Sequence, residues 1–594
     1  MRTSTVLRIQ PASYNRFLLL VAGLGGLLYG IDVGIIAGAL PYLEATSGLN
    51  AGQISIVVAA VLLGTVISTL FAGLLADRMG RKRLMMLSGV LFAASIPVIA
   101  LSHGYEVLIL GRLCQGISAG LIGVVVPLYL AECLAPQDRG RGTAMFQWLL
   151  TIGIVAAALV GMYFSLRVEE VAKLGNPQLL FAYKDHAWRS IFWVSLPPGL
   201  FFVLGSFCVA ESPRWLHQRG QTQLAMEALS RSRSPQQARL ELEDMERSRT
   251  AEKIKAAGRR AAESLLQRKY VLPFLLACLI LALNQTTGIN SIIGYNISVL
   301  VQSGLSDVAA HWGYIIFTAV QALATVIGML LVDRKGRKFL LSVGTAGIVV
   351  SLFITAFLFY RSERHRVDVR QAVQSVVHGQ AGLKLNFTPA LERQWLNEAG
   401  HANLAGKPAT LTIIYSYGDF SAVTPAALSN HALGAPVQLS RSNCVPANRV
   451  LAFFSNPFGN LDEARTAPLR IEHALITPLP GRGNGWLVAI CLFVFAAFYA
   501  MGPGICVWLA LSELMPTRIR SNGMSIALLI NEAVATFLAA IFLPTVGRYG
   551  YTSMFLLFAG CTVIYLLAAV FLLPETKGKT LEEIEVHFSR TRKA

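Results

Sequence analysis

Charged residues are scarce in this chain of 594 residues. They make up 14% of the sequence, against about 25% in a typical soluble domain. Hydrophobic residues make up 54%, and the mean hydropathy is +0.54. This composition argues against an ordinary soluble protein.

Motifs for metals, nucleotides and disulfides are also missing. Seven of the eight cysteines lie in or beside apolar runs, and Cys444 alone lies in a long polar connection, where it has no partner for a disulfide. No Cys/His spacing indicates zinc, and no GxxxxGK loop indicates ATP. The GLGGLLYG stretch lies inside an apolar run with no preceding strand, which excludes a dinucleotide fold. We therefore expect no metal, no cofactor and no enzyme activity.

Long apolar runs dominate what is present. A transmembrane helix needs about 20 mostly apolar residues, and runs of that length must be helical in lipid because each satisfies its own backbone hydrogen bonds. The run from Phe17 to Leu40 is too long for a cleaved signal peptide. Twelve such runs are found, near 17–40, 52–76, 84–102, 107–132, 143–166, 189–209, 270–302, 308–332, 339–360, 486–513, 521–545 and 551–573.

The net charge of +18 could suggest a nucleic-acid partner, but its distribution indicates membrane topology. Basic residues gather in every second connection between the apolar runs. The short alternate connections 41–51, 103–106 and 303–311 contain no Lys or Arg. This positive-inside asymmetry predicts that both termini are cytoplasmic, and we expect no nucleic acid.

One charged hexapeptide occurs twice, as DRMGRK at 77–82 and DRKGRK at 333–338. The copies join runs 2 and 3 and runs 8 and 9, the same place in two sets of six. Two further motif pairs follow in register: AECLAPQDRGRG with LSELMPTRIRSNG, and AESPRWL with LPETKGKTLEEIE. The repeat predicts an all-α membrane protein with twelve transmembrane helices in two six-helix halves.

The repeated charged loops are candidates for a cytoplasmic gate, because ion pairs there can form in one conformation and break in another. Simple positive-inside anchoring is the alternative, and both can hold. The predicted gating residues are Asp77, Arg81, Glu132, Arg139, Glu211, Arg214, Asp333, Arg337, Glu513 and Arg518.

Ionisable residues inside membrane spans cost free energy to bury, so they are functional candidates. Asp32 lies in run 1 and Arg112 at the start of run 4. A carboxylate held between burial and a nearby arginine can change its protonation as the conformation changes. The pair is therefore predicted to couple protons, with a static buried ion pair as the alternative.

Amide side chains both donate and accept hydrogen bonds, as recognition of a hydroxyl-rich ligand requires, and an aromatic ring suits its C–H faces. Amides in membrane spans also join helices, so each candidate has that alternative. The candidates within the runs are Gln147, Asn284, Gln285, Asn290, Gln321, Trp508 and Asn531.

Taken together, the motifs resemble the sugar porter family of the major facilitator superfamily. They stand in the family's order, from GGLLYGIDVG (25–34) through GRLCQGISAG (111–120) and TTGIN (286–290) to PETKGKTLEEIE (574–585). The resemblance implies alternating access for a monosaccharide, with sugar contacts at Gln147, at the run Asn284–Asn290 and at Trp508. It also places Tyr295 near an outer gate. Because proton symporters of this family have Asp at the position of Asp32, it favours H⁺ symport.

The chain departs from the family pattern at four candidate positions. Asn284 replaces Gln, Thr287 replaces Ser, Gln321 replaces Asn, and Glu532 stands where Trp is common. A carboxylate at Glu532 would change the polarity of the site or join the proton path. These departures leave the sugar unidentified.

Two long connections complete the predicted organisation. Residues 361–485 separate runs 9 and 10 and are expected to form an outside-facing α+β insertion, with strands at 409–420 and 449–455 and a helix near 367–377. Residues 210–269 read as an amphipathic cytoplasmic linker. The predicted parts are 1–209 (N-terminal half), 210–269 (linker), 270–360 (helices 7–9), 361–485 (insertion) and 486–594 (helices 10–12 and tail).

The favoured function is a secondary active transporter that imports a hexose or pentose with H⁺, in a bacterial inner membrane. A facilitative uniporter and a sugar sensor are the alternatives. The expected partners are the sugar, the proton, the lipid bilayer and an unknown ligand or partner of 361–485. GPG at 502–504 is expected to break span 10.

Overall fold

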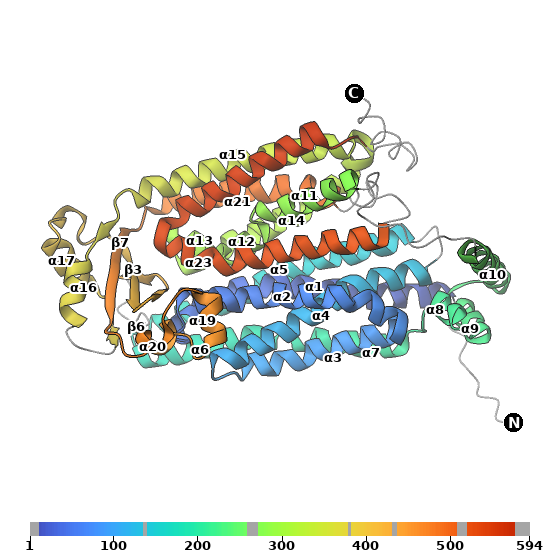
Figure 1. Cartoon of the computed structure of the whole chain (residues 1–594), viewed down its shortest axis with the longest axis horizontal. Coiled ribbons are helices and arrows are strands. Elements are labelled where there is room, and N and C mark those ends of the chain that lie inside the picture. The colour runs from blue at the N-terminus through green and yellow to red at the C-terminus, as the bar shows by residue number, and fades with distance from the viewer. Residues whose placement is uncertain are drawn as a thin grey trace.

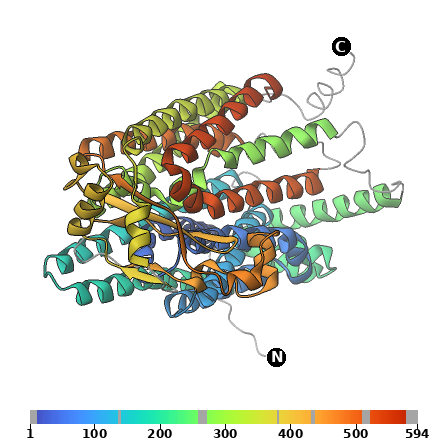
Figure 2. The same cartoon turned by 60° about the vertical axis from the view of Figure 1, so that its left-hand side comes forward.

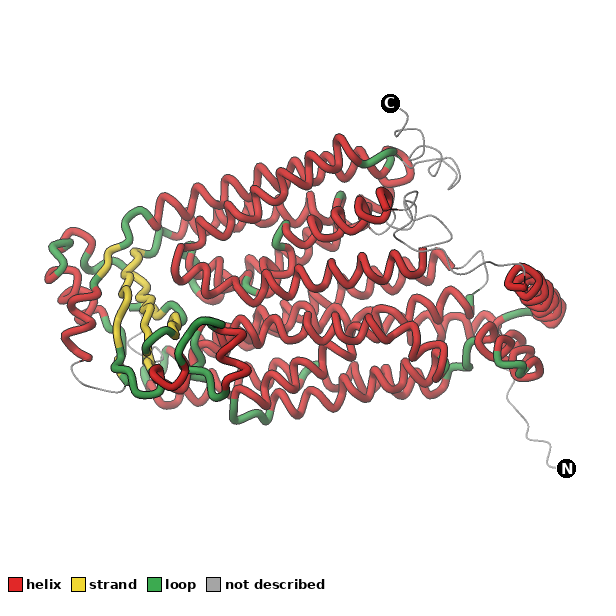
Figure 3. The backbone as a smooth tube through the Cα atoms, viewed as in Figure 1, coloured by secondary structure: helices red, strands yellow, loops and turns green. Residues whose placement is uncertain are grey.

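The computed structural model describes residues 11–134, 139–257, 271–377, 382–429, 436–507 and 520–575. Long helices run side by side through most of the molecule (Figure 1). Within these residues, all the strands lie at one end of the long helices, and the helices α8–α10 lie at the other. We call these the α/β end and the linker end; Figure 3 shows the separation of strand from helix.

The first part of the chain is a set of long helices. Span 6 was expected at 189–209, but the helical segment begins twelve residues earlier. Asn176 accepts hydrogen bonds from the N–H groups of Gln178 and Leu179, and Pro177 occupies the first helical position. The elements are α1 (Pro11–Thr46), α2 (Ala51–Met79), α3 (Arg81–Ala100), α4 (Tyr105–Cys133), α5 (Arg139–Ala172), α6 (Pro177–Trp193) and α7 (Leu196–Cys208).

The linker follows as α8 (Pro213–Gln218), α9 (Thr222–Ser232) and α10 (Pro235–Ala257). Its apolar face is covered within itself, around Leu216, Leu229 and Leu242. Arg233 ties it to the first part by donating to the Cys133 carbonyl at 2.9 Å. The predicted linker continues to residue 269, but residues 258–269 lie outside the described part of the chain.

The second part contains broken as well as long helices. Its elements are α11 (Val271–Thr286), α12 (Ile289–Gly294), α13 (Asn296–Gln302), α14 (Asp307–Lys335), α15 (Arg337–Glu363), α21 (Arg482–Met501), α23 (Arg520–Leu567) and the π-helical turn η2 (Ala568–Leu572). Gly502 leaves the helical conformation, so the break expected at the GPG motif is confirmed. Figure 2 shows these helices packed beside those of the first part.

Eleven helical segments within the described ranges are long and apolar enough to cross a membrane. The last of them, Gly523–Leu572, has 50 residues, which as one helix would measure about 75 Å against a hydrocarbon core of about 30 Å. It is in fact two helices, because Gly550 has φ 87° and ψ 165°. Glu363 accepts hydrogen bonds from the N–H groups of Tyr551 and Thr552 and so caps the second helix.

Residues 364–481, which we call the α/β body, separate α15 from α21. Its antiparallel sheet has the order β1-β7-β3-β4, with β5 also paired to β3, and β2 pairs with β6. The strands are β1 (Val367–Asp368), β2 (Leu383–Leu385), β3 (Ala409–Tyr417), β4 (Phe420–Val423), β5 (Ala427–Leu428), β6 (Val437–Leu439) and β7 (Arg470–Pro478). The helices are α16 (Arg370–Val377), α17 (Pro389–Glu398), η1 (Ala402–Leu404), α18 (Arg441–Cys444), α19 (Arg449–Ser455) and α20 (Leu461–Ala464).

The strand predicted at 409–420 and the helix predicted near 367–377 are present, as β3 with β4 and as α16. The strand predicted at 449–455 is wrong, because these residues form helix α19. Asn448 caps it by accepting from the Leu451 N–H at 2.9 Å. A run of five apolar residues, such as 450–454, fits a strand or a helix equally well by periodicity. The α/β body has its own core, which includes Trp395, Tyr415 and Ile471.

Buried apolar clusters show how the two parts of the bundle meet. At the α/β end one cluster contains residues of both parts, including Ile36 and Leu40 with Tyr295 and Phe542. Toward the linker end, the cluster around Met85 and Tyr129 draws only on the first part, and the cluster around Leu341 and Tyr565 only on the second. The two parts are therefore packed together at the α/β end.

Candidate functional site

Asp32 and Arg112 meet deep between α1 and α4. Both side chains are almost fully buried, and Arg112 Nη1 lies 3.9 Å from Asp32 Oδ1. Arg112 also donates to Gln115 Oε1 at 2.7 Å, and its guanidinium lies 5.5 Å from the centre of the Phe192 ring. Within the described residues, neither oxygen of Asp32 accepts a hydrogen bond. The structure thus brings the predicted pair together as a loose ion pair.

Glycines allow α1 to approach α5 closely enough to fix this geometry. A Cβ added at Gly30 would lie 1.9 Å from the Leu150 carbonyl oxygen, and one at Gly153 would lie 2.3 Å from the Leu27 carbonyl oxygen. Backbone therefore packs on backbone on that face of α1. The close packing sets the height and rotation of α1, and with them the position of Asp32.

The TTGIN motif interrupts the seventh predicted span. Gly288 has φ +82°, and a Cβ there would lie 2.5 Å from the Phe558 ring, so the turn between α11 and α12 requires glycine. The turn places Asn290 so that its amide donates to Gln285 Oε1 at 2.9 Å. The sequence indicated one continuous run here, whereas the structure has α11, α12 and α13.

Two of the predicted amides lie beside residues that were not predicted as sugar contacts, namely two tyrosines and a carboxylate. Asn284 on α11 donates to the Tyr499 hydroxyl of α21 at 3.4 Å. Asn531 on α23 is fully buried and donates to Glu532 at 3.2 Å. Both Tyr499 and Tyr29 lie within electrostatic range of Glu532. The only signal for Tyr29 and Tyr499 was a polar ring in an apolar run.

Several buried polar atoms in these helices have no hydrogen-bond partner within the described residues. Buried polar groups are nearly always satisfied, so an unsatisfied group needs a reason. A hydroxyl-rich ligand would supply the missing hydrogen-bond partners, because its hydroxyls both donate and accept. The atoms are Asn284 Oδ1, Asn531 Oδ1, Gln321 Oε1, Gln115 Nε2 and both oxygens of Asp32.

Tyr295 lies where the two parts of the bundle close together. Its hydroxyl donates to the Ala539 carbonyl at 3.0 Å and lies 3.2 Å from Ser55 Oγ on α2. Its ring stacks on Phe542 at 4.4 Å. A second link, which sequence reasoning missed, joins Tyr42 and Ser165 to Asp307 at 2.9 and 2.5 Å. These bonds hold the α/β end shut.

The first charged hexapeptide forms a compact network at the linker end. Gly80 has φ +94°, and α3 starts directly after it without a side-chain cap from Gly80. Glu211 supplies the cap by accepting from the N–H groups of Arg81 and Lys82 at 2.9 and 3.1 Å. Arg81 also bridges Asp77 at 3.1 Å and Glu132 at 2.9 Å.

The second hexapeptide repeats this arrangement. Gly336 has φ +93°, and Glu575 accepts from the N–H groups of Arg337 and Lys338 at 3.1 and 3.2 Å. Glu575 was not among the predicted gating residues, although LPETKGK was paired in the sequence with AESPRWL. The signal was therefore present: Glu575 matches Glu211.

The remaining predicted residues have fewer contacts or cannot be placed. Within the described part of the chain, Gln147 and Gln321 make no side-chain hydrogen bond to another predicted residue, and exposed Arg214 has no ion pair. Trp508, Glu513 and Arg518 lie outside the described residues, as do the side chains of Arg139 and Asp333.

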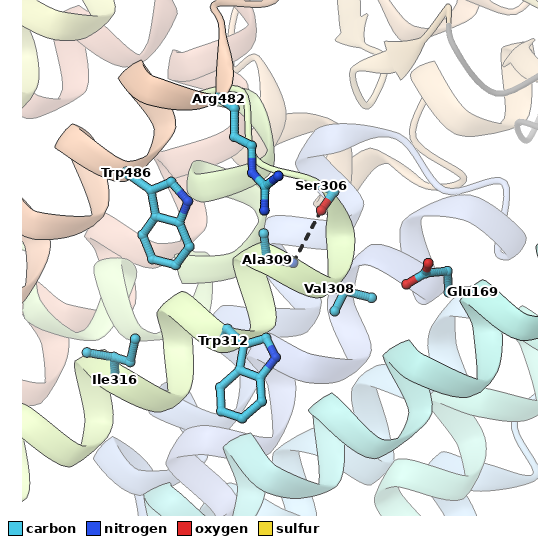
Figure 4. Close-up of a pocket in the computed structure, with 8 residues that line it drawn as sticks. All are labelled: Glu169, Ser306, Val308, Ala309, Trp312, Ile316, Arg482 and Trp486. Carbon is cyan, nitrogen blue, oxygen red and sulfur yellow. Dashed lines mark hydrogen bonds between the residues drawn. The ribbon is translucent and has the colours of Figure 1, made fainter.

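A separate pocket of about 400 Å³ lies near the α/β end, between α5, α14 and α21 (Figure 4). Trp312 and Trp486 line it, with Arg482 and Glu169 at its edge. Trp312 is 51% exposed, as expected of the aromatic residues that border a bilayer. None of the predicted sugar residues lines this pocket.

Comparison with known proteins identifies the class. The family model described as "Sugar (and other) transporter" matches residues 18–377 and 472–588. This chain therefore belongs to that family of sugar porters, and it is a multi-pass membrane transporter rather than an enzyme. The model skips residues 378–471, which lie inside the α/β body.

Individual relatives are similar over most of the chain. The human "Proton myo-inositol cotransporter" is 28% identical over 583 residues, covering 96% of this chain and 81% of the relative. The "Arabinose-proton symporter" of Bacillus subtilis is 30% identical over 340 residues, covering 57% of this chain and 70% of the relative. The crystal structure of a "D-xylose-proton symporter" superposes with a TM-score of 0.61 at 20% identity, covering 96% of this chain and all of that one.

Proposed function

We propose that this protein imports a monosaccharide in symport with H⁺ by alternating access. The observation that carries the proposal is the geometry of Asp32, a buried carboxylate with no hydrogen bond to a described residue and one arginine at 3.9 Å. Such a group changes its protonation readily when the distance to its partner changes. The names of the human, Bacillus and xylose-transporting relatives support coupling to a proton and a sugar or polyol as the substrate.

The proposed architecture has twelve spans, with Gly550 dividing the last apolar segment into spans 11 and 12. We place the termini and the linker in the cytoplasm, and the α/β body outside, in a bacterial inner membrane. Residues 1–209 and the two segments 270–360 and 486–594 then form the halves, and residues 361–485 form the insertion. The basic linker-end loops support this orientation.

The sugar site is proposed at the gathered amides Asn284, Gln285, Asn290 and Asn531, joined by Gln147, Gln321 and Trp508. Their unsatisfied oxygens suit the hydroxyls of a sugar. Tyr295 belongs to the outer gate, which is closed here. The hexapeptide networks form the cytoplasmic gate elements.

The test is radiolabelled uptake into proteoliposomes with a panel of hexoses and pentoses, with and without an inward proton gradient. We expect accumulation above equilibrium that a protonophore abolishes. In Asp32→Asn, accumulation should be lost while sugar counterflow remains, because only the coupling is removed. Exposed Glu227→Gln is the control. Uptake that equilibrates and ignores the gradient would establish a uniporter, and absence of uptake would favour the sensor.

A further inference from the structure

Glu532 is a carboxylate in the middle of the predicted sugar site that the proposed transport cycle does not use. It lies deep in the bundle on α23 and is still partly accessible, as is Tyr29 on α1. A residue that is deep and yet accessible faces a space that solvent reaches. Its contact with Asn531 places Glu532 beside one of the amides of the proposed sugar site.

The charges around Glu532 do not balance. Asp32 has Arg112, but Glu532 has no ion pair with any residue of the described part of the chain; its one side-chain hydrogen bond comes from Asn531 at 3.2 Å. The titratable groups in electrostatic range of Glu532 are Tyr29 from α1 and Tyr499 from α21. Neither of these is a cation, and an unpaired buried carboxylate is costly.

The neighbours also suit a cation. Tyr29 and Tyr499 lie within electrostatic range of the carboxylate, and an aromatic face attracts an ammonium group. A carboxylate with two tyrosines supplies both the charge and the rings that bind a substituted ammonium. Asn284 and Asn531 remain beside them to bind hydroxyls.

We propose that Glu532 is a specificity residue that selects sugars or polyols carrying an ammonium group. This inference rests on the proposed sugar transport and narrows its substrate class. The ammonium group would pair with Glu532 and rest against Tyr29 and Tyr499, while the hydroxyls bind the amides. Asp32 remains free for the proton.

The test measures binding of D-glucosamine and D-glucose to the purified full-length protein at pH 6.5 by calorimetry. Wild type should bind glucosamine at least about tenfold more tightly, as a charge-assisted contact predicts. Glu532→Gln should bring the ratio close to one while glucose binding persists, which also shows that the variant is folded. Glu532→Asp, which keeps the charge, should retain the preference, as should the control Glu169→Gln.

The possible failures are distinct. Wild type that binds glucose as tightly as glucosamine, or a preference that survives in Glu532→Gln, overturns the specificity role and leaves sugar transport standing. Wild type that binds neither compound and transports no sugar overturns both.

A second inference rests on different contacts, those of the α/β body. It is joined to the second half through α15 and α21, and Ser362 donates to the Pro478 carbonyl at 3.3 Å. It also touches the first half, where Asn443 donates to the Gly48 carbonyl at 2.7 Å and accepts, through its own carbonyl, from Asn50. Ile414 and Val423 pack on Ala51 at the start of α2.

The α/β body thus bridges the two halves at the end where they are closed. Outward opening must separate α2 from α23, and the body, fixed to the second half, must then release Gly48, Asn50 and Ala51. We infer that these contacts form a latch that favours the outward-closed state. The latch is the set Gly48, Asn50 and Ala51 with Ile414, Val423 and Asn443.

The latch is tested with a cysteine at position 58, because Val58 is buried between the halves beside Gly294. The variant Val58→Cys is labelled from outside with a membrane-impermeant maleimide. Asn443→Ala should raise the labelling rate about threefold or more, because the closed state loses contacts that the open state lacks. Ala51→Asp should do the same by placing a charge in the apolar contact, while an acidic first turn still favours α2.

Asn456→Ala is the matched control, because among the described residues the Asn456 side chain bonds only within the α/β body, to the Asp419 carbonyl and the Phe458 N–H. Its labelling rate should equal that of the parent. Equal rates in all variants, or faster labelling in the control alone, would overturn the latch.

Discussion

Gly288 is the single residue on which the shape of the seventh span depends most. Its φ of +82° is strained for any other residue, and a Cβ would lie 2.5 Å from Phe558. We expect Gly288→Ala to lower the stability by about 1–3 kcal/mol and to impair sugar binding by moving Asn290. Thermal unfolding in detergent measures the first effect. Gly73→Ala, where no atom is near, should be neutral; equal Tm values for both variants would contradict this role.

Glu392, in the α/β body, gives a pH dependence outside the membrane. Burial raises the pKa of this carboxyl, which is 1% exposed. Its folded-state pKa therefore exceeds the unfolded value of about 4.3, so the stabilisation is complete below that pH and is lost as pH rises through the folded pKa.

Hydrogen exchange of the β3 peptide, 409–417, should therefore speed up as pH rises through this window, after correction for the intrinsic exchange rate. Glu392→Gln should flatten the profile because it cannot ionise. An unchanged profile in that variant would assign the dependence to another group.

At the scale of elements, the capping glutamates tie distant helices together. Glu211 holds the start of α3, and Glu575 holds the start of α15. We expect Glu211→Gln and Glu575→Gln each to cost about 1–3 kcal/mol, since each loses charge-assisted bonds to two backbone N–H groups. Hydrogen exchange of peptides from each half, measured on the full-length protein at increasing denaturant concentration, gives the free energy of unfolding that checks this. Glu227→Gln is the surface control, and a loss of stability equal in all three would contradict the capping role.

The sequence predicted the elements better than their interruptions. Runs of about 20 apolar residues can only be helices in a membrane, so the long helices followed directly. The breaks at Gly288 and at the start of α6 depend on one turn or cap and leave hydropathy unchanged. The α19 error arose because the five consecutive apolar residues Val450–Phe454 have no distinguishing period.

The candidate site was predictable only in part, for a related reason. Asp32, Arg112 and the amides stand out because polar residues are rare in apolar runs. Tyr29, Tyr499 and the Asp307 links do not stand out, since tyrosine is ordinary in a span and Asp307 lies in a loop-like stretch. Their positions depend on packing between helices distant in sequence.

At the scale of the whole molecule, we expect the α/β body to be separable from the proposed sugar site. The family model continues on either side of residues 378–471, and the Ile471 N–H donates to Gln374 Oε1 at 2.9 Å, so the two ends of that stretch lie close together. Replacing 378–471 with a short Gly/Ser linker should preserve sugar uptake, because every predicted site residue lies outside it. Proteoliposome uptake measures this. A folded, monodisperse variant without uptake would show that the body takes part in transport.

The three glycine–glutamate caps, at Gly80, Gly336 and Gly550, stiffen each half from within. In the proposed alternating-access cycle, stiff halves rotate about the site between them, and the α/β body lies at the far end of that rotation. A force at a long radius exerts a large torque. A few hydrogen bonds at Asn443 therefore resist opening far more effectively than the same bonds would beside the sugar, so weak contacts at the rim can set the balance of the cycle.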